Sequence, residues 1–454
     1  MALRSKIVPL VVASPLFLQN VDSSVMATAL PSIASSLDVD VLHLNLAITS
    51  YLLSLAVFLP LSGWVAERFG AKRVFCTAIA MFSLGSALCG MADSLASLVL
   101  YRILQGLGGA MMLPVGRLIL LRSVPATQLI AAMVWFTVPP VIGRMLGPLL
   151  GGAIVTWTSW RWIFLVNIPF GLLSIAMAML FIDDSKEVAS TGSFDLGGFL
   201  LLAFGLTGMI GALEAAGKGL LPSWVIGLIG AAGLLATVIY CRRSKADPII
   251  DFAILWHPTY RTSIIGGAPL RIAVGASPFL LPLMLQLGFG LSALDAGLLT
   301  MATAVGSLAT RAVMVKAIRL IGYRSLLITT TALTSLIYAS YALFTAQTPH
   351  PLMFGVLMIG GLVNALGMVA LQTLGYSEIP KPLMSHATTL ASMAQQLCLS
   401  LGVMFGASLL SAAVWWRGGT TTLIAADFSP AFVAIGAITL LSLAFFLRLK
   451  KDAE

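Results

Sequence analysis

Apolar residues run through this chain in long segments, and polar residues gather in the short intervals between those segments. A helix needs about 20 apolar residues to cross a bilayer, and fourteen segments of suitable length are bounded by charges, Pro/Gly clusters or polar turns. The predicted spans are 7–31, 44–66, 73–93, 96–121, 127–155, 161–181, 195–215, 223–241, 262–288, 293–317, 324–345, 351–375, 384–414 and 430–449. The pattern predicts an all-α polytopic membrane protein.

Composition excludes a soluble enzyme. Hydrophobic residues make up 59% of the chain and charged residues only 9%, whereas a soluble domain carries about 25% charged residues. The four histidines and four cysteines lack the spacing of a metal site or a catalytic centre, and no Walker motif is present. Despite the net charge of +9, no block of basic residues suggests nucleic-acid binding. We therefore expect no enzyme activity, no metal and no cofactor.

The distribution of positive charge predicts how the chain lies in the membrane. Eighteen of the 26 Lys and Arg residues fall on one side of the fourteen predicted spans. The opposite loops hold only Arg161, Lys218 and Arg417. Because cytoplasmic loops are enriched in Lys and Arg, both termini are predicted to be cytoplasmic, in a multi-pass protein of the cell inner membrane.

The two halves of the chain show a weak internal repeat. Gly70, in the turn after the second span, is in register with Gly322, in the turn after the tenth. Internal repeats are typical of secondary transporters. We therefore predict a six-helix bundle over residues 1–182, a linker with two inserted transmembrane helices over 183–260, and a second six-helix bundle over 261–454.

A charged turn separates the second and third spans. Its notable residues are Gly63, Glu67, Arg68, Gly70, Lys72 and Arg73. Gly70 permits a tight turn, and the acid and bases can pair across a cytoplasmic gate between helix bundles. The alternative is that these bases only set the orientation in the membrane.

Two charged residues, one basic and one acidic, lie at apparent membrane depth. Arg102 in the fourth span needs a partner, because an unpaired guanidinium in the bilayer costs several kcal/mol. Asp22 is the only acid of the first span, and an intramembrane acid suggests function by default. We expect Asp22 to carry the transported proton. The alternative is a permanent pair with Arg102 or Arg117 that only braces helices.

The fifth span carries a glycine-rich face interrupted by a cation. Its residues are Gly143, Arg144, Gly147, Pro148, Gly151 and Gly152. Pro148 removes a backbone hydrogen bond and the glycines flatten one face, so a bend and a close contact with a helix of the other half are expected. Arg144 either fills a substrate or water cavity or extends toward the membrane edge.

Together these stretches resemble the major facilitator superfamily, in particular its 14-helix drug:proton antiporter family of EmrB/QacA type, close to HsrA-like members. The charged turn is similar to G-x-L-a-D-r-x-G-r-k, with Glu67 in place of the usual Asp. The run from Arg102 to Gly106 resembles the R-x-x-Q-G motif associated with proton coupling, and the fifth span resembles the antiporter motif g-x-x-x-G-P-x-x-G-G. The Trp160–Gly171 segment resembles the family's W-R-W-I-F-x-x-N-x-P-x-G run, which we interpret as structural.

The resemblance implies a proton-coupled efflux transporter, a drug or small-molecule/H⁺ antiporter that works by alternating access. It implies a small-molecule substrate, protons and the lipid bilayer as partners, with a periplasmic adaptor in some relatives. The candidate substrate-binding residues are Asp22, Arg117, Arg144, Arg271, Gln286, Arg311, Gln395 and Gln396.

Arginines on the core spans outnumber the one deep acid, which favours anionic or zwitterionic substrates. The alternatives are an exporter or facilitator of amphiphilic lipids or endogenous metabolites, and a non-transporting scaffold or sensor.

Overall fold

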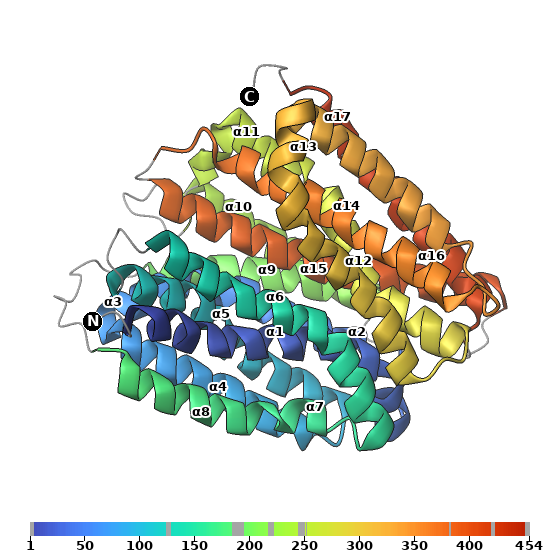
Figure 1. Ribbon diagram of the computed structural model, residues 1–454, viewed down its shortest axis with the longest axis horizontal. Helices are drawn as coiled ribbons and strands as arrows, with labels where there is room; N and C mark the ends of the chain where they lie inside the picture. Colours follow the sequence, from blue (N-terminus) through green and yellow to red (C-terminus); the bar gives the residue numbers. More distant parts are fainter. Residues whose placement is uncertain are drawn as a thin grey trace. The chain divides into compact units, whose positions relative to one another are not determined.

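A computed structural model describes residues 4–123, 129–183, 195–216, 222–243, 250, 252–380, 383–418 and 423–449. Across these residues all regular structure is helical (Figure 1). In a bilayer no water is available to unpaired backbone groups, so segments that satisfy their own hydrogen bonds are favoured. The all-α prediction is confirmed.

The helices follow the hydropathy pattern closely. The first half contains α1 (Arg4–Leu37), α2 (Asn45–Phe58), α3 (Leu61–Phe69), α4 (Ala71–Gly90), α5 (Leu95–Ser123), α6 (Leu129–Trp157), α7 (Trp162–Leu165), α8 (Asn167–Phe181), α9 (Leu196–Ala216) and α10 (Ser223–Arg242). The second half contains η2 (Phe252–Trp256), α11 (Pro258–Arg261), η3 (Thr262–Gly266), α12 (Ala268–Leu283), η4 (Met284–Gly288), α13 (Ala293–Tyr341), α14 (His350–Tyr376), α15 (Met384–Trp416), α16 (Ala425–Leu440) and α17 (Leu443–Phe446).

Thirteen of these segments, within the described residues, are long and apolar enough to cross a membrane. The pair α2 and α3 passes the same test together, with a bend of 57° between its parts, which brings the candidate spans to fourteen. The bend lies at Pro60, whose ring removes a backbone donor and ends the preceding helix. The predicted second span is therefore a broken span.

Helix α13 contains two predicted spans. Its backbone leaves the helical conformation at Gly322, where φ is 71° and ψ is 164°. This conformation is readily adopted only by glycine. The apolar segment Ala293–Thr310 precedes this residue, and the segment Lys316–Tyr341 contains it. The kink at Gly322 therefore lies between the predicted spans 293–317 and 324–345.

The chain divides into two compact units. Unit 1 comprises Met1–Met26, Ser35–Val39 and Leu46–Ile250, and unit 2 comprises Ala27–Ala34, Asp40–Asn45 and Asp251–Glu454. Helices α9 and α10, which match the predicted inserted pair, belong to unit 1. The division into two six-helix bundles with an insertion between them stays a prediction.

In unit 1, helices α1, α4, α5 and α8 run side by side along most of their length (Figure 1). Helices α9 and α10 pack on each other through small residues. A Cβ atom built on Gly208 would lie 3.2 Å from the Cα of Gly233, and one built on Gly233 would lie 2.8 Å from the Met209 nitrogen. Small residues let helices approach closely where lipid supplies no hydrophobic driving force. These two helices therefore form a tight hairpin.

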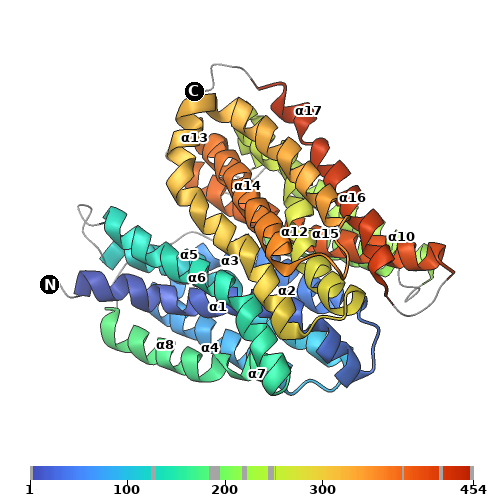
Figure 2. The ribbon, with the colours of Figure 1, turned by 45° about the vertical axis from the view of Figure 1, so that its right-hand side comes forward.

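In unit 2, helices α12 to α16 form a second bundle (Figure 2). Helices α13 and α14 are in backbone contact at two glycines. A Cβ atom on Gly361 would overlap the Thr303 carbonyl, and one on Gly306 would overlap the Met358 carbonyl. Because both obstacles are backbone atoms, no side-chain rotation relieves the overlap.

Gly361→Ala is therefore expected to destabilise unit 2 by about 3 kcal/mol, since overpacking a tight contact typically costs 1–3 kcal/mol. Gly355→Ala is the matched control on the same helix, because its Cβ would meet nothing within 4 Å. Thermal melting of the two purified variants checks this. Equal melting temperatures would contradict the close α13–α14 contact.

Candidate functional site

A polar cluster lies buried among the membrane-length helices of unit 1. Asp22 on α1 and Arg102 on α5 are 3% and 1% exposed, and Nη1 of Arg102 lies 2.6 Å from Oδ2 of Asp22. The same nitrogen donates to Oε1 of Gln105 at 2.7 Å. The predicted partner of the Arg102 guanidinium is therefore Asp22, the one acidic residue of the first predicted span.

The second oxygen of Asp22 is held by two neutral amides. Its Oδ1 accepts a hydrogen bond from Nε2 of Gln105 at 3.0 Å and another from Nδ2 of Asn167 at 2.9 Å. Both amide side chains are fully buried. Three donors from two helices therefore satisfy the ionised carboxylate, which offsets the cost of burying it.

Two aromatic rings cover the guanidinium. The Arg102 Cζ atom lies 4.7 Å from the ring centre of Phe164 and 5.3 Å from that of Tyr51. A cation over an aromatic face gains electrostatic attraction, and the gain is larger where both groups are desolvated. Arg102 thus has favourable contacts besides Asp22.

Glycines of the R-x-x-Q-G run let α5 approach its neighbours. A Cβ on Gly106 would lie 2.6 Å from the Ser54 side chain on α2, and one on Gly108 would lie 2.6 Å from backbone atoms of Ala78 and Phe82 on α4. This close packing brings Arg102 within reach of Tyr51 and Asp22, as small residues on a helix face allow.

The charged turn lies between α3 and α4. Gly63, Glu67 and Arg68 are exposed on α3, and Arg73 is exposed on α4. Gly70 joins the two helices with φ of 89° and ψ of 131°. Gly322, its predicted counterpart in the second half, also has a positive φ. The two turns of the internal repeat share this backbone feature.

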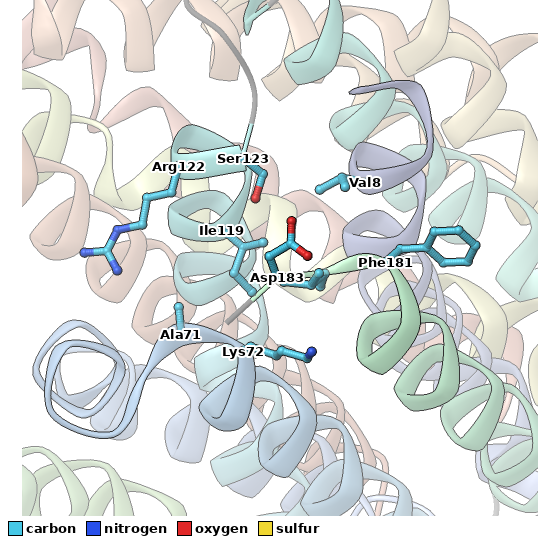
Figure 3. Close-up of a pocket in the computed structure, with 9 residues that line it drawn as sticks. Val8, Ala71, Lys72, Ile119, Arg122, Ser123, Phe181 and Asp183 are labelled. Atoms are coloured by element: carbon cyan, nitrogen blue, oxygen red, sulfur yellow. The ribbon is translucent and has the colours of Figure 1, made fainter. Parts of the chain in front are cut away.

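Lys72 of the same turn is half-buried and lines a cavity of about 240 Å³ at one end of unit 1. Arg122, Ser123 and Asp183 also line it, from the ends of α5 and α8. Figure 3 shows the Asp183 carboxylate between Ser123 and Val8, with the Arg122 side chain extending outward. Charged groups of both signs thus line this cavity. The gating role of the turn stays a prediction.

Substituting Gly70 with alanine is expected to cost about 1–2 kcal/mol, because an L residue is strained at this positive φ. If the turn forms part of a cytoplasmic gate, as the sequence predicts, transport should fall with it. Gly63→Ala is the control from the same motif, because its Cβ would meet nothing within 4 Å. Melting temperature and uptake by vesicles check both variants, and a fully active Gly70→Ala protein would contradict the importance of the turn.

The glycine-rich face of α6 packs on α1, within the same unit. A Cβ on Gly143 would lie 2.6 Å from the Phe17 carbonyl, and one on Gly147 would overlap the Ser24 side chain. The expectation that this face contacts a helix of the other half is therefore wrong for these two glycines. Sequence spacing identifies a face suited to close packing and does not identify its partner.

The remaining residues of this motif lie on the same continuous helix. Gly151 and Gly152 are buried, and α6 runs through Pro148 without interruption. Arg144 is exposed, and its Nη2 donates to Oδ1 of Asn20 on α1 at 2.9 Å.

The other substrate-binding candidates are distributed over both units. Arg117 is exposed on α5 of unit 1, and Gln286 and Gln396 are half-buried on η4 and α15 of unit 2. Oε1 of Gln395 accepts from Nε2 of Gln372 at 3.1 Å. Arg311 lies on α13, and its side chain is outside the described residues. Neither unit alone brings all these candidates together.

Arg271 on α12 is a deeply buried cation in unit 2, with 2% exposure. Its Nη1 donates to the backbone carbonyl of Ser263. Its Nε has no hydrogen-bond partner among the described residues. This arginine therefore retains unused donor capacity at membrane depth.

Comparison with known proteins identifies the family. Residues 16–403 match the sequence profile of the Major Facilitator Superfamily. The chain belongs to the Major Facilitator Superfamily. Members of this family are transporters rather than enzymes, and this chain is accordingly a multi-pass membrane transporter.

Relatives from bacteria share more than the fold. Proteins named "Putative multidrug resistance protein MdtD" from Salmonella dublin and Salmonella typhimurium are each 39% identical over 405 residues, which cover 88% of this chain and 85% of each relative. The predicted resemblance to a 14-helix member of the superfamily is confirmed.

Solved structures agree with this fold. A D-xylose-proton symporter superposes with a TM-score of 0.70 at 15% identity, covering 99% of this chain and 98% of the other. A bacterial homologue of the human lysosomal transporter Spinster, in an inward-facing and unoccupied conformation, superposes with a TM-score of 0.65 at 14% identity, covering 98% and 96%. At these identities the likeness concerns the fold alone.

Three members of the buried cluster were not predicted from the sequence. Asn167 lies in a segment interpreted as structural, and no role was predicted for Tyr51 or for Ser86, whose hydroxyl accepts from Nδ2 of Asn167 at 2.9 Å. One available signal was the polarity of Asn167, which lies in an otherwise apolar span.

Proposed function

We propose that this superfamily member is a proton-coupled efflux transporter, which exchanges protons for a small-molecule substrate by alternating access. The buried Asp22–Arg102 pair is the observation that carries the proposal. An ionisable pair at membrane depth is costly, and such pairs mark proton relays in pumps and transporters.

The contacts of Arg102 support a cycle of proton binding and release. When Asp22 takes up a proton, the attraction between its carboxyl and the guanidinium weakens. Arg102 then keeps Oε1 of Gln105 and the rings of Tyr51 and Phe164 as partners. A proton can thus loosen the contact between α1 and α5 without leaving an uncompensated cation.

Two further observations support export as the direction. The relatives at 39% identity carry a name that refers to multidrug resistance, and the fifth span retains the glycine face of the antiporter motif against α1. We infer that binding of a proton from one side and of substrate from the other alternately favours the two states of the transporter.

Two arginines, one in each unit, support anionic or zwitterionic substrates. Arg271 is buried with donor capacity unused, and Arg144 is exposed with an amide partner. A site lined by cations attracts negative charge and disfavours lipophilic cations. The proposal also includes a location in the inner membrane with both termini cytoplasmic, and a periplasmic adaptor as a partner. Both are predictions from the sequence.

The substrate class and the proton coupling can be tested one after the other with the purified protein. A panel of anionic, zwitterionic, cationic and lipid-like compounds is first screened for thermal stabilisation, since a ligand that binds only the folded state raises the melting temperature. Hits are then tested in proteoliposomes with an imposed pH gradient. Substrate flux accompanied by a change in lumenal pH supports the proposal, and flux that is indifferent to the gradient overturns proton coupling.

The orientation gives a separate prediction. A reporter enzyme that is active only outside the cytoplasm is expected to be inactive when fused after Glu454, whereas a fluorescent reporter that folds in the cytoplasm should be bright there. Fusion of the same reporters within the segment around Lys218 should give the opposite result. Periplasmic activity at the C-terminus would overturn the predicted orientation.

A further inference from the structure

Asn167 holds a central place in the buried cluster, and neither the motifs nor the proposed proton cycle assigns it a role. The residue begins α8, directly after the short helix α7, and is fully buried. Its Nδ2 donates to Oδ1 of Asp22 and to Oγ of Ser86, both at 2.9 Å. Its Oδ1 is buried without a hydrogen-bond partner among the described residues.

A carboxyl group changes its hydrogen-bonding requirement when it binds a proton. The ionised form only accepts, whereas the protonated form must also donate one O–H bond. The Oε1 atom of Gln105 already accepts from Arg102 at 2.7 Å. The unpartnered Oδ1 of Asn167 belongs to the amide that already contacts Asp22, so rotation of that amide about χ2 would present an acceptor.

We propose that Asn167 is a positioning residue for proton coupling, whose amide donates to ionised Asp22 and turns over to accept from protonated Asp22. This inference rests on the proposed function, in which Asp22 carries the proton. The amide nitrogen thus contacts the ionised form of Asp22 and the amide oxygen contacts the protonated form. The oxygen supplies a hydrogen-bond acceptor at a buried position that water does not reach.

The same turnover changes the bonding of Ser86. In the ionised state the Ser86 hydroxyl accepts from Asn167 and donates to the Phe164 carbonyl at 2.9 Å. Once Asn167 presents its oxygen, the hydroxyl donates to that oxygen and releases the carbonyl. The Phe164 carbonyl then loses its hydrogen bond from Ser86. The Phe164 ring also covers the Arg102 guanidinium, which at the same step loses the negative charge of Asp22. Protonation is thereby transmitted to the junction between α7 and α8.

The surroundings of Asp22 allow its titration to be followed separately. Arg102 on α5, Tyr51 on α2 and Cys89 on α4 are titratable groups of the described chain that interact electrostatically with it. The contact from α8 is the neutral Asn167 amide. Replacing Asn167 with an apolar residue therefore leaves these three titratable groups in place.

The test measures protonation of Asp22 directly, by infrared difference spectroscopy of the purified full-length protein over a pH series. The Asp22→Asn variant identifies the carboxyl band that belongs to Asp22. In Asn167→Leu, the midpoint of this band is expected to move about one pH unit higher, because a charge-assisted donor is lost together with a weaker neutral acceptor. A purely structural role would lower the melting temperature and leave the midpoint unchanged.

Two more variants keep the test decisive. Asn364→Leu is the matched control, since Asn364 on α14 of unit 2 is also a hydrogen-bonded amide within a membrane-length helix, accepting from Thr334 at 2.9 Å and donating to Tyr338 at 3.2 Å. It should leave the midpoint unchanged. Asn167→Asp is nearly isosteric and should fold even if the leucine variant does not. Because two adjacent carboxyls cannot both ionise easily, a protonated carboxyl band should persist at pH values where the wild-type band has gone.

The outcomes separate the two proposals. If the wild-type protein shows no Asp22 band that titrates, Asp22 is not the proton carrier and the proposed function fails at this site. If the band titrates and neither Asn167 variant changes it, only the positioning role is overturned. A shifted midpoint in Asn167→Leu or a persistent band in Asn167→Asp, with Asn364→Leu unchanged, supports the role.

Discussion

Asp22→Asn is expected to abolish substrate movement driven by a pH gradient, while the variant remains folded and binds substrate. Asparagine nearly matches aspartate in size but does not titrate in the working pH range, so it resembles the protonated state permanently. Flux into proteoliposomes under an imposed gradient should fall to the level of protein-free liposomes. Binding, followed by thermal stabilisation at several pH values, should survive and depend less on pH, because proton and substrate are no longer linked.

The contacts of Arg102 explain why the fold should tolerate this change. The guanidinium keeps its bond to Gln105 at 2.7 Å and its position over two aromatic rings, and the new amide oxygen can accept from it. The loss should stay below the 3–5 kcal/mol typical of an orphaned buried charge. A large fall in melting temperature would instead indicate a structural brace. Normal stability with intact pH-driven transport would contradict both interpretations and turn attention to Glu67 or to Glu214, which is buried on α9.

The helices could be predicted from the sequence because the bilayer imposes a simple rule on it. Each span must be apolar over a fixed length, and this requirement located α9, α10 and α14 to within a few residues. The break at Pro60 was not predicted, since hydropathy does not register a change of direction within an apolar run. The turn at Gly322 was predicted, because glycine in register with Gly70 is itself a conformational signal.

The candidate site was predictable only in part, for a related reason. Asp22 and Arg102 could be identified because a charge in an apolar span raises the free energy of the protein in the membrane. This effect can be judged from one residue and its neighbours in the sequence. The pairing of the two depends on how α1 packs against α5, which no local pattern encodes. Asn167 is neutral, so its cost is smaller and its importance emerges only from the atoms around it. The packing partner of Gly143 was missed in the same way.

Removal of the cation should have a larger effect on stability than removal of the acid. In Arg102→Gln, ionised Asp22 keeps at most neutral donors, and a buried charge without its counterion typically costs 3–5 kcal/mol. The cost should depend on pH. A buried carboxyl without a cation favours its protonated form, so the folded variant binds a proton more readily than the unfolded chain does. Its stability should therefore be highest at acidic pH and fall as the pH rises.

A double-mutant cycle tests this interpretation. Asp22→Asn combined with Arg102→Gln leaves no buried charge in the cluster, so the double variant should recover most of the lost stability and lose the added pH dependence. Arg161→Gln is the matched control: Arg161 lies over the Trp160 ring at 4.4 Å, but it donates to the Ser36 hydroxyl and the Ala92 carbonyl. This substitution should cost about 1 kcal/mol at every pH. If the effects of the two single substitutions at the cluster simply add, and if Arg102→Gln is equally unstable across the pH range, Asp22 and Arg102 are not an ion pair in the folded protein, and the proton cycle based on them is wrong.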